Sequence, residues 1–213
     1  MIIAIDGPAA AGKGTLAKRL AAELGLPYLD TGLLYRATAK RVLEANADPA
    51  DEQAALLAAR SLTQADFARP DLRDAETSKA ASQVASLPAV RQALLEFQRN
   101  FGGRHGAVLD GRDIGTIIFP KADVKLFVTA SVQARARRRW LEFQARGEEA
   151  DFAAVIADVE ARDEADRTRA SAPLIQAPDA LLIDTTTLDA DEAFATALKL
   201  VRAKTTERNI GLD

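Results

Sequence analysis

The chain has 213 residues, which suits one domain, or one domain with insertions. It has no cysteine and a single histidine, so it cannot form disulfides, a thiolate or multi-histidine metal site, or a catalytic thiol. The formal net charge of −3 argues against a general nucleic-acid binder, which needs a basic face for phosphates. No apolar run is long enough to span a membrane and no signal peptide fits the first residues, so we expect a cytoplasmic protein that binds neither nucleic acid nor membrane.

Five short apolar runs predict buried strands, at residues 1–6, 26–30, 106–110, 124–130 and 180–184. Their apolar residues are continuous rather than alternating, as is typical of strands covered on both faces. Helices are predicted between them, at 14–24, 33–45, over a long region to residue 100, and at 131–146, 151–168 and 190–204. This alternation predicts an α/β fold, an open parallel five-stranded sheet with helices on both faces. Ligands bind such sheets beyond the carboxyl ends of the strands.

The region 37–81 has a different composition. It is rich in Ala, Asp, Glu and Gln, is broken by Pro49 and Pro70, and contains no recognisable strand pair. We therefore predict a single domain, residues 1–213, in which 37–81 is a short and mostly helical insertion over the sheet.

The segment GPAAAGKGT, Gly7 to Thr15, lies between the first predicted strand and the first predicted helix. Gly7 and Gly12 permit backbone angles that other residues avoid, so the N–H groups of the loop can face inward as a nest for an anion. The N-terminus of the helix adds to this, and Lys13 can reach the β- and γ-phosphates of a nucleotide. A plain turn with an exposed lysine is the alternative, but the flanking strand and helix favour phosphate binding.

Gly14 departs from the usual Walker A loop, in which a serine or threonine follows the lysine and ligates magnesium. Thr15, one residue later, can still donate a hydrogen bond to a phosphate. Mg²⁺ would then be held mainly by phosphates and water, without a dedicated protein metal site. Asp110 ends an apolar run, as a Walker B carboxylate does, and could help from the outer sphere; a merely polar strand end remains open as the alternative.

The GKGT form of the loop resembles the nucleoside monophosphate kinases, whose acceptor already carries a phosphate. Two anions must then be brought together, so arginines are the chemical requirement. Arginines do follow the predicted strands: Arg36 after the second, Arg112 after the third, and RARRR at 135–139 after the fourth, while residues 162–174 precede the fifth.

In this last segment, Arg162, Asp166 and Arg169 have the spacing i, i+4 and i+7 of one helical face, which we predict to face the ligand. A solvated charged face is the usual alternative for such a run. We assign that role to the remaining charges, Asp163, Glu164 and Arg167.

Taken in order, DGPAAAGKGT, LDTGLLYR, SQVASLPAVR, LDGRDIGTIIFPKADVKLFVTAS, RARRR and RDEADRTRASAPL resemble the bacterial cytidylate kinases over nearly the whole chain outside 37–77 and the tail. The resemblance implies phosphorylation of CMP, and of dCMP, by ATP with Mg²⁺, with Lys13, Arg112 and Arg169 in catalysis. It implies a lid, here residues 131–168, that closes over ATP with Arg135, Arg138 and Arg139. The ATP-binding residues would be Gly7, Pro8, Ala9, Ala10, Ala11, Gly12, Lys13, Gly14 and Thr15.

The same resemblance implies the acceptor site. Thr31, Arg36 and Arg112 would hold the acceptor phosphate, and Arg169 would bridge the two phosphate groups. The ribose would contact Arg162 and Asp166. Cytosine would be read by Ser82, Arg91 and Asp113.

Elementary hydrogen bonding supports the assignment of the base-reading residues. Cytosine offers an amino donor at N4 and acceptors at N3 and O2, which suit a carboxylate at Asp113 and a guanidinium at Arg91. Ser82 and Arg91 flank Pro88, a predicted helix break that would aim both inward. Ordinary helix-surface polarity is the alternative for this pair.

The chain departs from many cytidylate kinases in its shorter insertion, which puts the geometry of closure over the acceptor in question. His105, Trp140 and Tyr28 are interpreted as packing or surface residues. We expect a monomer. The nearest competing interpretation is a kinase of the same fold for another acceptor, such as UMP or shikimate; a nucleotide-sensing or nucleic-acid-binding module that uses 135–139 as a basic patch is the competitor from another class.

Overall fold

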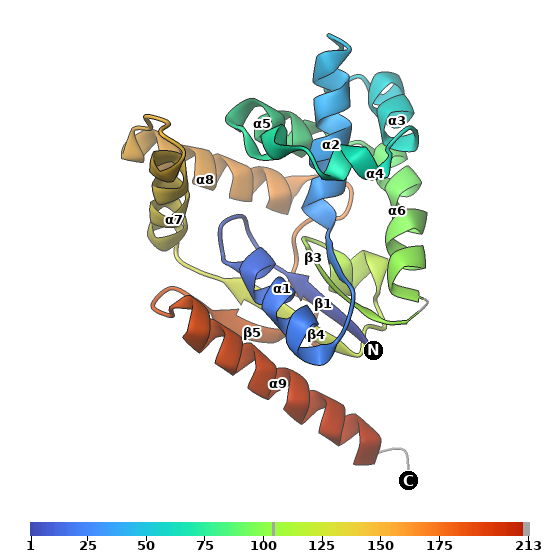
Figure 1. Ribbon diagram of the computed structural model, residues 1–213, viewed down its shortest axis with the longest axis vertical. Coiled ribbons are helices and arrows are strands. Elements are labelled where there is room, and N and C mark those ends of the chain that lie inside the picture. Colours follow the sequence, from blue (N-terminus) through green and yellow to red (C-terminus); the bar gives the residue numbers. More distant parts are fainter. Residues whose placement is uncertain (104, 211–213) are drawn as a thin grey trace.

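A parallel sheet at the centre of the molecule accounts for all five predicted strands. The computed structural model describes residues 1–103 and 105–210. The sheet runs in the order β2-β3-β1-β4-β5, with every neighbouring pair parallel (Figure 1). Its strands are β1 (Ile2–Asp6), β2 (Tyr28–Asp30), β3 (Ala107–Gly111), β4 (Val124–Thr129) and β5 (Leu181–Asp184).

Helices occupy the predicted intervals, and several begin where a side chain caps them. Asp51, Asp74, Ser131 and Asp151 each accept a hydrogen bond from a backbone N–H of the first helical turn. Within the described residues, no helix is both long and apolar enough to cross a membrane. The helices are α1 (Lys13–Leu24), α2 (Thr31–Glu44), α3 (Glu52–Arg60), α4 (Gln64–Phe67), α5 (Ala75–Val84), α6 (Pro88–Gly103), α7 (Val132–Ala145), α8 (Phe152–Thr168) and α9 (Ala190–Ile210), with a 3₁₀ turn η1 (Pro70–Arg73) and a π turn η2 (Ile114–Ile118).

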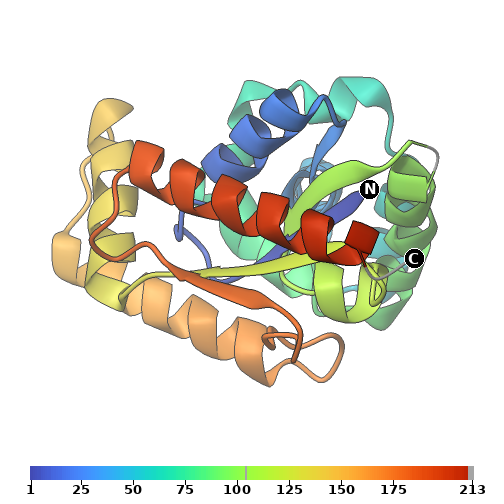
Figure 2. The same cartoon turned by 90° about the horizontal axis from the view of Figure 1, so that it is seen from below.

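Both faces of the sheet are covered, which explains the continuous apolar runs of the strands. On one face, Ile3 and Ile5 of β1 pack with Leu20 of α1 and Val201 of α9, and Figure 2 shows α9 running along the sheet. On the other face, Ala4 and its neighbours pack against η2 and against apolar side chains of α6. The predicted α/β architecture is confirmed.

The segment 37–81 is helical, as predicted, and contains no strand among its described residues. Together with α2 and α6 it forms a core of its own, in which Leu34, Val42, Val84 and Leu94 are buried. This helical layer stands over the carboxyl ends of the strands (Figure 1). A second, smaller core joins α7 and α8 into a helical hairpin on the other side of the same edge.

Strand register brings the carboxyl ends together at this edge. Asp30 of β2 pairs with Asp110 of β3, and Asp6 of β1 pairs with Gly111. Residues that follow the strands therefore lie between the sheet, the helical layer and the α7–α8 hairpin, where an open sheet binds its ligands.

Candidate active site

The loop between β1 and α1 has the backbone of an anion nest. Gly7 has a φ of 146°, and a β-carbon there would lie 1.9 Å from the carbonyl oxygen of Val128, so only glycine fits. Gly12, at the N-cap of α1, has a φ of 89°. Ala10 also adopts a left-handed φ of 58°, which costs a non-glycine residue about 1–2 kcal/mol. The predicted need for unusual backbone angles at Gly7 and Gly12 is confirmed.

This loop lines one end of a cavity of about 350 Å³. The helical layer, the ends of β2 and β3, and the α7–α8 hairpin supply the rest of the lining. Gly7, Pro8, Arg135 and Arg138 lie outside the described lining. The predicted residues that the cavity brings together are Ala9, Ala10, Ala11, Gly12, Lys13, Gly14, Thr15, Thr31, Arg36, Ser82, Arg91, Arg112, Asp113, Arg139, Arg162, Asp166 and Arg169.

Positive charge dominates the cavity, with nine lysine and arginine side chains against five carboxylates among the lining residues. Three buried arginine nitrogens, Arg36 Nε, Arg162 Nε and Arg169 Nη2, have no hydrogen-bond partner among the described residues. Burial lowers the pKa of Arg162 to about 9, and the charge of Arg112 adds to the shift. Buried donors without partners are costly, so a bound anion with several oxygens would stabilise the site.

Lys13 is buried at the base of the loop, where its Nζ donates a hydrogen bond of 2.7 Å to the carbonyl oxygen of Pro8. Burial lowers its pKa to about 7, and repulsion by Arg112 acts in the same direction. Phosphate oxygens would favour the charged lysine, because an opposite charge nearby stabilises the ion.

We therefore expect ADP binding at about pH 8 to take up as much as about one proton per site, because Lys13 is mostly neutral in the free protein and charged in the complex. Calorimetric titration with Mg²⁺-ADP in buffers of different ionisation enthalpy measures this uptake. It should vanish below about pH 6, where the lysine already carries its proton. In Lys13→Met the uptake at pH 8 should vanish; an unchanged uptake in that variant would contradict the assignment.

The base-reading residues predicted from the sequence lie together across the helix break at Pro88. Arg91 Nη2 donates to Asp113 Oδ2, both side chains are buried, and the guanidinium lies 5.5 Å from the centre of the Tyr35 ring. Ser82 lines the same cavity from α5, where its Oγ lies 3.5 Å from the carbonyl oxygen of Ser78. The Arg91–Asp113 pair thus presents a hydrogen-bond donor and a hydrogen-bond acceptor side by side.

Asp113 pairs with Arg91, whereas Arg112 pairs with another carboxylate. Its Nε donates a hydrogen bond of 2.6 Å to Asp166 of α8. Burial alone would raise the pKa of Asp166, but the charge and hydrogen bond of Arg112 hold it below the usual range. Arg169 lies 3.8 Å from Asp166 and 3.9 Å from Asp113, so these side chains form one continuous network.

The predicted helical face of 162–169 is only partly correct. Arg162 and Asp166 face the cavity, but α8 ends at Thr168, and Arg169 follows it with an extended ψ of 138°. Arg169 therefore lines the cavity from beyond the end of the helix, where its Nε donates a hydrogen bond to the carbonyl oxygen of Ala172. Arg167 is exposed and paired with Glu164, as predicted.

Asp163 corrects the sequence interpretation, which placed it on a solvated face. Its side chain is 21% exposed and forms a two-pronged ion pair with the buried Arg135 of α7. The prediction was wrong because the partner lies 28 positions earlier along the chain, so helical spacing alone could not reveal it.

Tyr28 was interpreted as a packing or surface residue without a function, yet it lines the cavity and donates a hydrogen bond of 2.7 Å to Asp110 Oδ1. Arg73, in the insertion, reaches Asp30 Oδ2 at 2.8 Å at the same edge. The position of Asp30 at the end of the predicted strand 26–30 was the signal that could have identified it. Trp140, on α7, does pack, as predicted, against the ring of Phe152 of α8.

A bound metal ion would lie near one carboxylate, Asp110, and would not be enclosed by a set of protein ligands. Within the described part of the chain, no group of three or more acidic or histidine side chains could hold a metal. A β-carbon on Gly14 would lie 3.6 Å from the Tyr28 hydroxyl and 3.9 Å from Asp110 Oδ2, so the position of the usual hydroxyl ligand is next to this bonded pair. Burial and the charge of Asp30 raise the pKa of Asp110 to about 6. The donor set fits Mg²⁺ that is held by phosphates and water with Asp110 beside it.

A parallel sheet whose first strand leads into a phosphate loop, below a cavity lined with arginines, defines a P-loop kinase. A family model described as cytidylate kinase matches residues 3–203. The chain belongs to the cytidylate kinase family.

Individual relatives agree with this family. A protein named cytidylate kinase from Acidiphilium cryptum is 63% identical over 201 residues, which cover 94% of this chain and 95% of that protein. Another of the same name, from Paramagnetospirillum magneticum, is 59% identical over 207 residues, 95% of this chain and 98% of its own length.

Solved structures share the fold at low sequence identity. An uncharacterised protein from Eubacterium ventriosum superposes with a TM-score of 0.55 at 15% identity, over 95% of this chain and 98% of its own. The protein TT1252 from Thermus thermophilus gives a TM-score of 0.50 at 23% identity, over 96% of this chain and 97% of its own.

Proposed function

We propose that the chain catalyses ATP + CMP → ADP + CDP, and that dCMP is a second acceptor. The observation that carries this proposal is one cavity with a phosphate loop at one end and buried, unpartnered arginine nitrogens at the other. Membership of the cytidylate kinase family supports the choice of acceptor. The chain acts in pyrimidine nucleotide metabolism, as a monomer in the cytoplasm.

The donor end binds the phosphates of ATP. The loop from Gly7 to Thr15 surrounds them with backbone N–H groups, and Lys13 supplies a positive charge from below. Mg²⁺, when bound, neutralises charge on the donor phosphates. Asp110, held by Tyr28, lies beside that position and can accept hydrogen bonds from the water around the metal.

The acceptor end holds CMP. Arg36 and Arg112 bind its phosphate with Thr31, whose hydroxyl is held by the carbonyl oxygen of Asp110 at 2.8 Å. The base contacts Asp113, Arg91 and Ser82, and the ribose contacts Arg162 and Asp166. Arg169 lies between the two groups.

Catalysis in such a site is positioning and neutralisation of charge. Arg112, Arg169 and Lys13 offset the repulsion between two anions and the charge that shifts during in-line transfer. The chain forms one domain with the helical insertion 37–81, and residues 131–168 form a lid that keeps water from the phosphoryl group. Of the three predicted lid arginines, Arg139 is the one that lines the cavity.

An ADP-release assay with ATP and a panel of acceptors tests the proposal. CMP and dCMP should be turned over, whereas UMP, AMP and shikimate should react far more slowly. A preference for UMP or shikimate would change the assigned acceptor and leave the assignment as a kinase intact. No turnover with any acceptor would reject both assignments.

Arg169→Ala should lower kcat by about 100- to 1,000-fold and change the KM for CMP much less, because its charge acts between donor and acceptor phosphates. The buried, unpartnered Nη2 of Arg169 is consistent with a partner that arrives with substrate. Steady-state kinetics with varied CMP measure both parameters.

Arg167→Ala is the matched control. Arg167 is exposed and pairs with the exposed Glu164, so its removal should leave kcat within about twofold. If Arg167→Ala proved more harmful than Arg169→Ala, the proposed position of Arg169 in the reaction would be wrong.

A further inference from the structure

Two polar side chains behind the phosphate loop hold the carbonyl groups on either side of the left-handed Ala10. The carbonyl oxygen of Ala9 accepts a hydrogen bond of 3.3 Å from Arg135 Nη1. The carbonyl oxygen of Ala11 lies 3.0 Å from the hydroxyl of Thr185, which also lies 3.1 Å from the carbonyl oxygen of Thr129. Neither Arg135 nor Thr185 is among the residues that line the cavity.

Arg135 is fixed in this place by several bonds. Its side chain is 4% exposed, and its Nε donates to the carbonyl oxygen of Ala130 at 2.9 Å. Its two terminal nitrogens lie 2.9 and 2.5 Å from the two carboxylate oxygens of Asp163 on α8. Because all three nitrogens of this guanidinium donate hydrogen bonds, the side chain has little freedom to turn toward a nucleotide.

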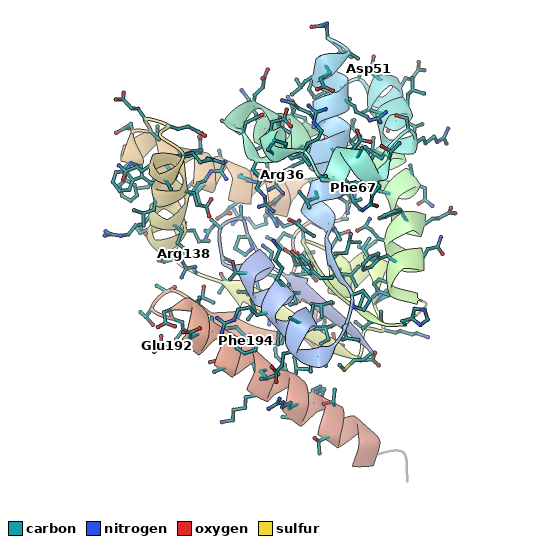
Figure 3. The ribbon with its side chains drawn as sticks, in the orientation of Figure 1. Arg36, Asp51, Phe67, Arg138, Glu192 and Phe194 are labelled. Carbon is teal, nitrogen blue, oxygen red and sulfur yellow. The ribbon has the colours of Figure 1, made fainter. Side chains whose placement is uncertain are left out.

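Arg138, one turn further along α7, holds the second contact. Its Nη1 donates to the Thr185 hydroxyl at 3.0 Å and its Nη2 to the Thr185 carbonyl oxygen at 2.5 Å. Figure 3 shows Arg138 on the part of α7 that faces the connection between β5 and α9. Arg139, the next residue, points instead into the cavity.

The geometry points to Arg135 and Arg138 as positioning residues that hold the phosphate loop in its anion-binding shape from behind, with Asp163 fixing Arg135. The left-handed Ala10 is unfavourable by itself, and fixing the flanking carbonyls stabilises it. N–H groups turn inward only while this conformation is kept. This inference rests on the proposed function of the loop as the ATP site, and it assigns the two arginines a role other than direct contact with ATP.

Asp163 separates these two roles because it lies behind the loop and outside the cavity lining. If Arg135 positions the loop, Asp163→Ala loosens the loop and weakens nucleotide binding. If Arg135 instead contacts the nucleotide, the same change frees it from a competing ion pair and tightens binding. The two roles therefore predict effects of opposite sign.

Calorimetric titration with Mg²⁺-ADP is the test. Asp163→Ala and Arg135→Lys should raise the Kd of ADP about tenfold, as the loss of a charged hydrogen bond implies, while the Kd of CMP changes by less than about twofold. Asp163→Asn, which keeps one acceptor, should fall between wild type and Asp163→Ala. Glu164→Gln and Arg137→Ala, the neighbouring exposed changes on the same two helices, should leave both constants unchanged.

Amide ¹H–¹⁵N spectra of the ligand-free proteins give a second readout. The signals of residues 10–12 should shift in Asp163→Ala and not in Glu164→Gln. Unchanged or tighter ADP binding by a folded Asp163→Ala, or unshifted loop signals, would overturn the inference; Asp163→Asn decides it if the alanine variant does not fold. Failure of the wild-type protein to bind ADP would instead reject the proposed function, and the spectra would still decide whether these side chains position the loop.

Discussion

Lys13→Ala should lower turnover by about two to four orders of magnitude, as expected when one preorganised donor to transition-state charge is removed. Lys13 is buried beneath the loop and bonds the carbonyl oxygen of Pro8, so no bulk solvent can replace its charge at that position. Initial rates at saturating ATP and CMP measure the loss.

The fold should survive this change. The pKa of Lys13 is lowered to about 7 by burial, so the protein already holds this side chain at a cost and its removal relieves that cost. Circular dichroism and the melting temperature provide the check. Arg19→Ala, which removes a charge from the same helix outside the cavity lining, should leave turnover within about threefold. Near-normal turnover by a folded Lys13→Ala protein would show that the loop is not the donor site.

CMP should be preferred to UMP in kcat/KM by up to about four or five orders of magnitude, the range that sites built on hydrogen bonds can reach. Uracil places a carbonyl oxygen where cytosine has its N4 amino group, and its N3 becomes a donor. The Asp113 carboxylate would then face an acceptor and the Arg91 guanidinium a donor. Both side chains are buried, so neither mismatch can be relieved by water.

Asp113→Asn tests this assignment, because an amide can either donate or accept. The variant should weaken the use of CMP and narrow the gap to UMP. Asp113 has an alternative role, which is only to orient neighbouring arginines. The structure pairs it with Arg91 and brings it near Arg169, whereas Arg112 is held by Asp166.

Measurement of kcat/KM for both nucleotides, in wild type and variant, distinguishes the two roles. An orienting role would lower both values by the same factor. An unchanged ratio of CMP to UMP would therefore remove Asp113 from base reading and leave the kinase assignment intact.

The strands and the phosphate loop could be predicted because their signals are local. A strand covered on both faces must be apolar along its whole length, so the five continuous runs marked the sheet. Gly7 and Gly12 lie where the backbone requires positive φ. Glycine is the residue that adopts positive φ at no steric cost, so the residue types alone predict these positions. The order β2-β3-β1-β4-β5 is not local, because it depends on how each helix crosses the sheet.

The polar contacts behind the loop could not be predicted in the same way. Arg135 lies 126 positions from Ala9, and Thr185 lies 174 positions from Ala11, so no spacing rule connects them. The resemblance implied one lid role for Arg135, Arg138 and Arg139 of the RARRR segment, whereas the packing of α7 separates Arg135 and Arg138 from Arg139. The prediction that Asp163 lies on an exposed face was wrong for the same reason, because α7 covers this side chain.

The single tryptophan of the chain gives the α7–α8 hairpin an optical signal of its own. Trp140 donates through Nε1 to the carbonyl oxygen of Ala150 at 2.9 Å and meets the ring of Phe152 edge-on, with 6.0 Å between the ring centres. Emission excited at the red edge of the absorption band therefore arises from this hairpin alone. A rearrangement of the hairpin on ligand binding changes the surroundings of the indole. Stopped-flow fluorescence of the unlabelled protein can thus time the movement of the hairpin without an added label.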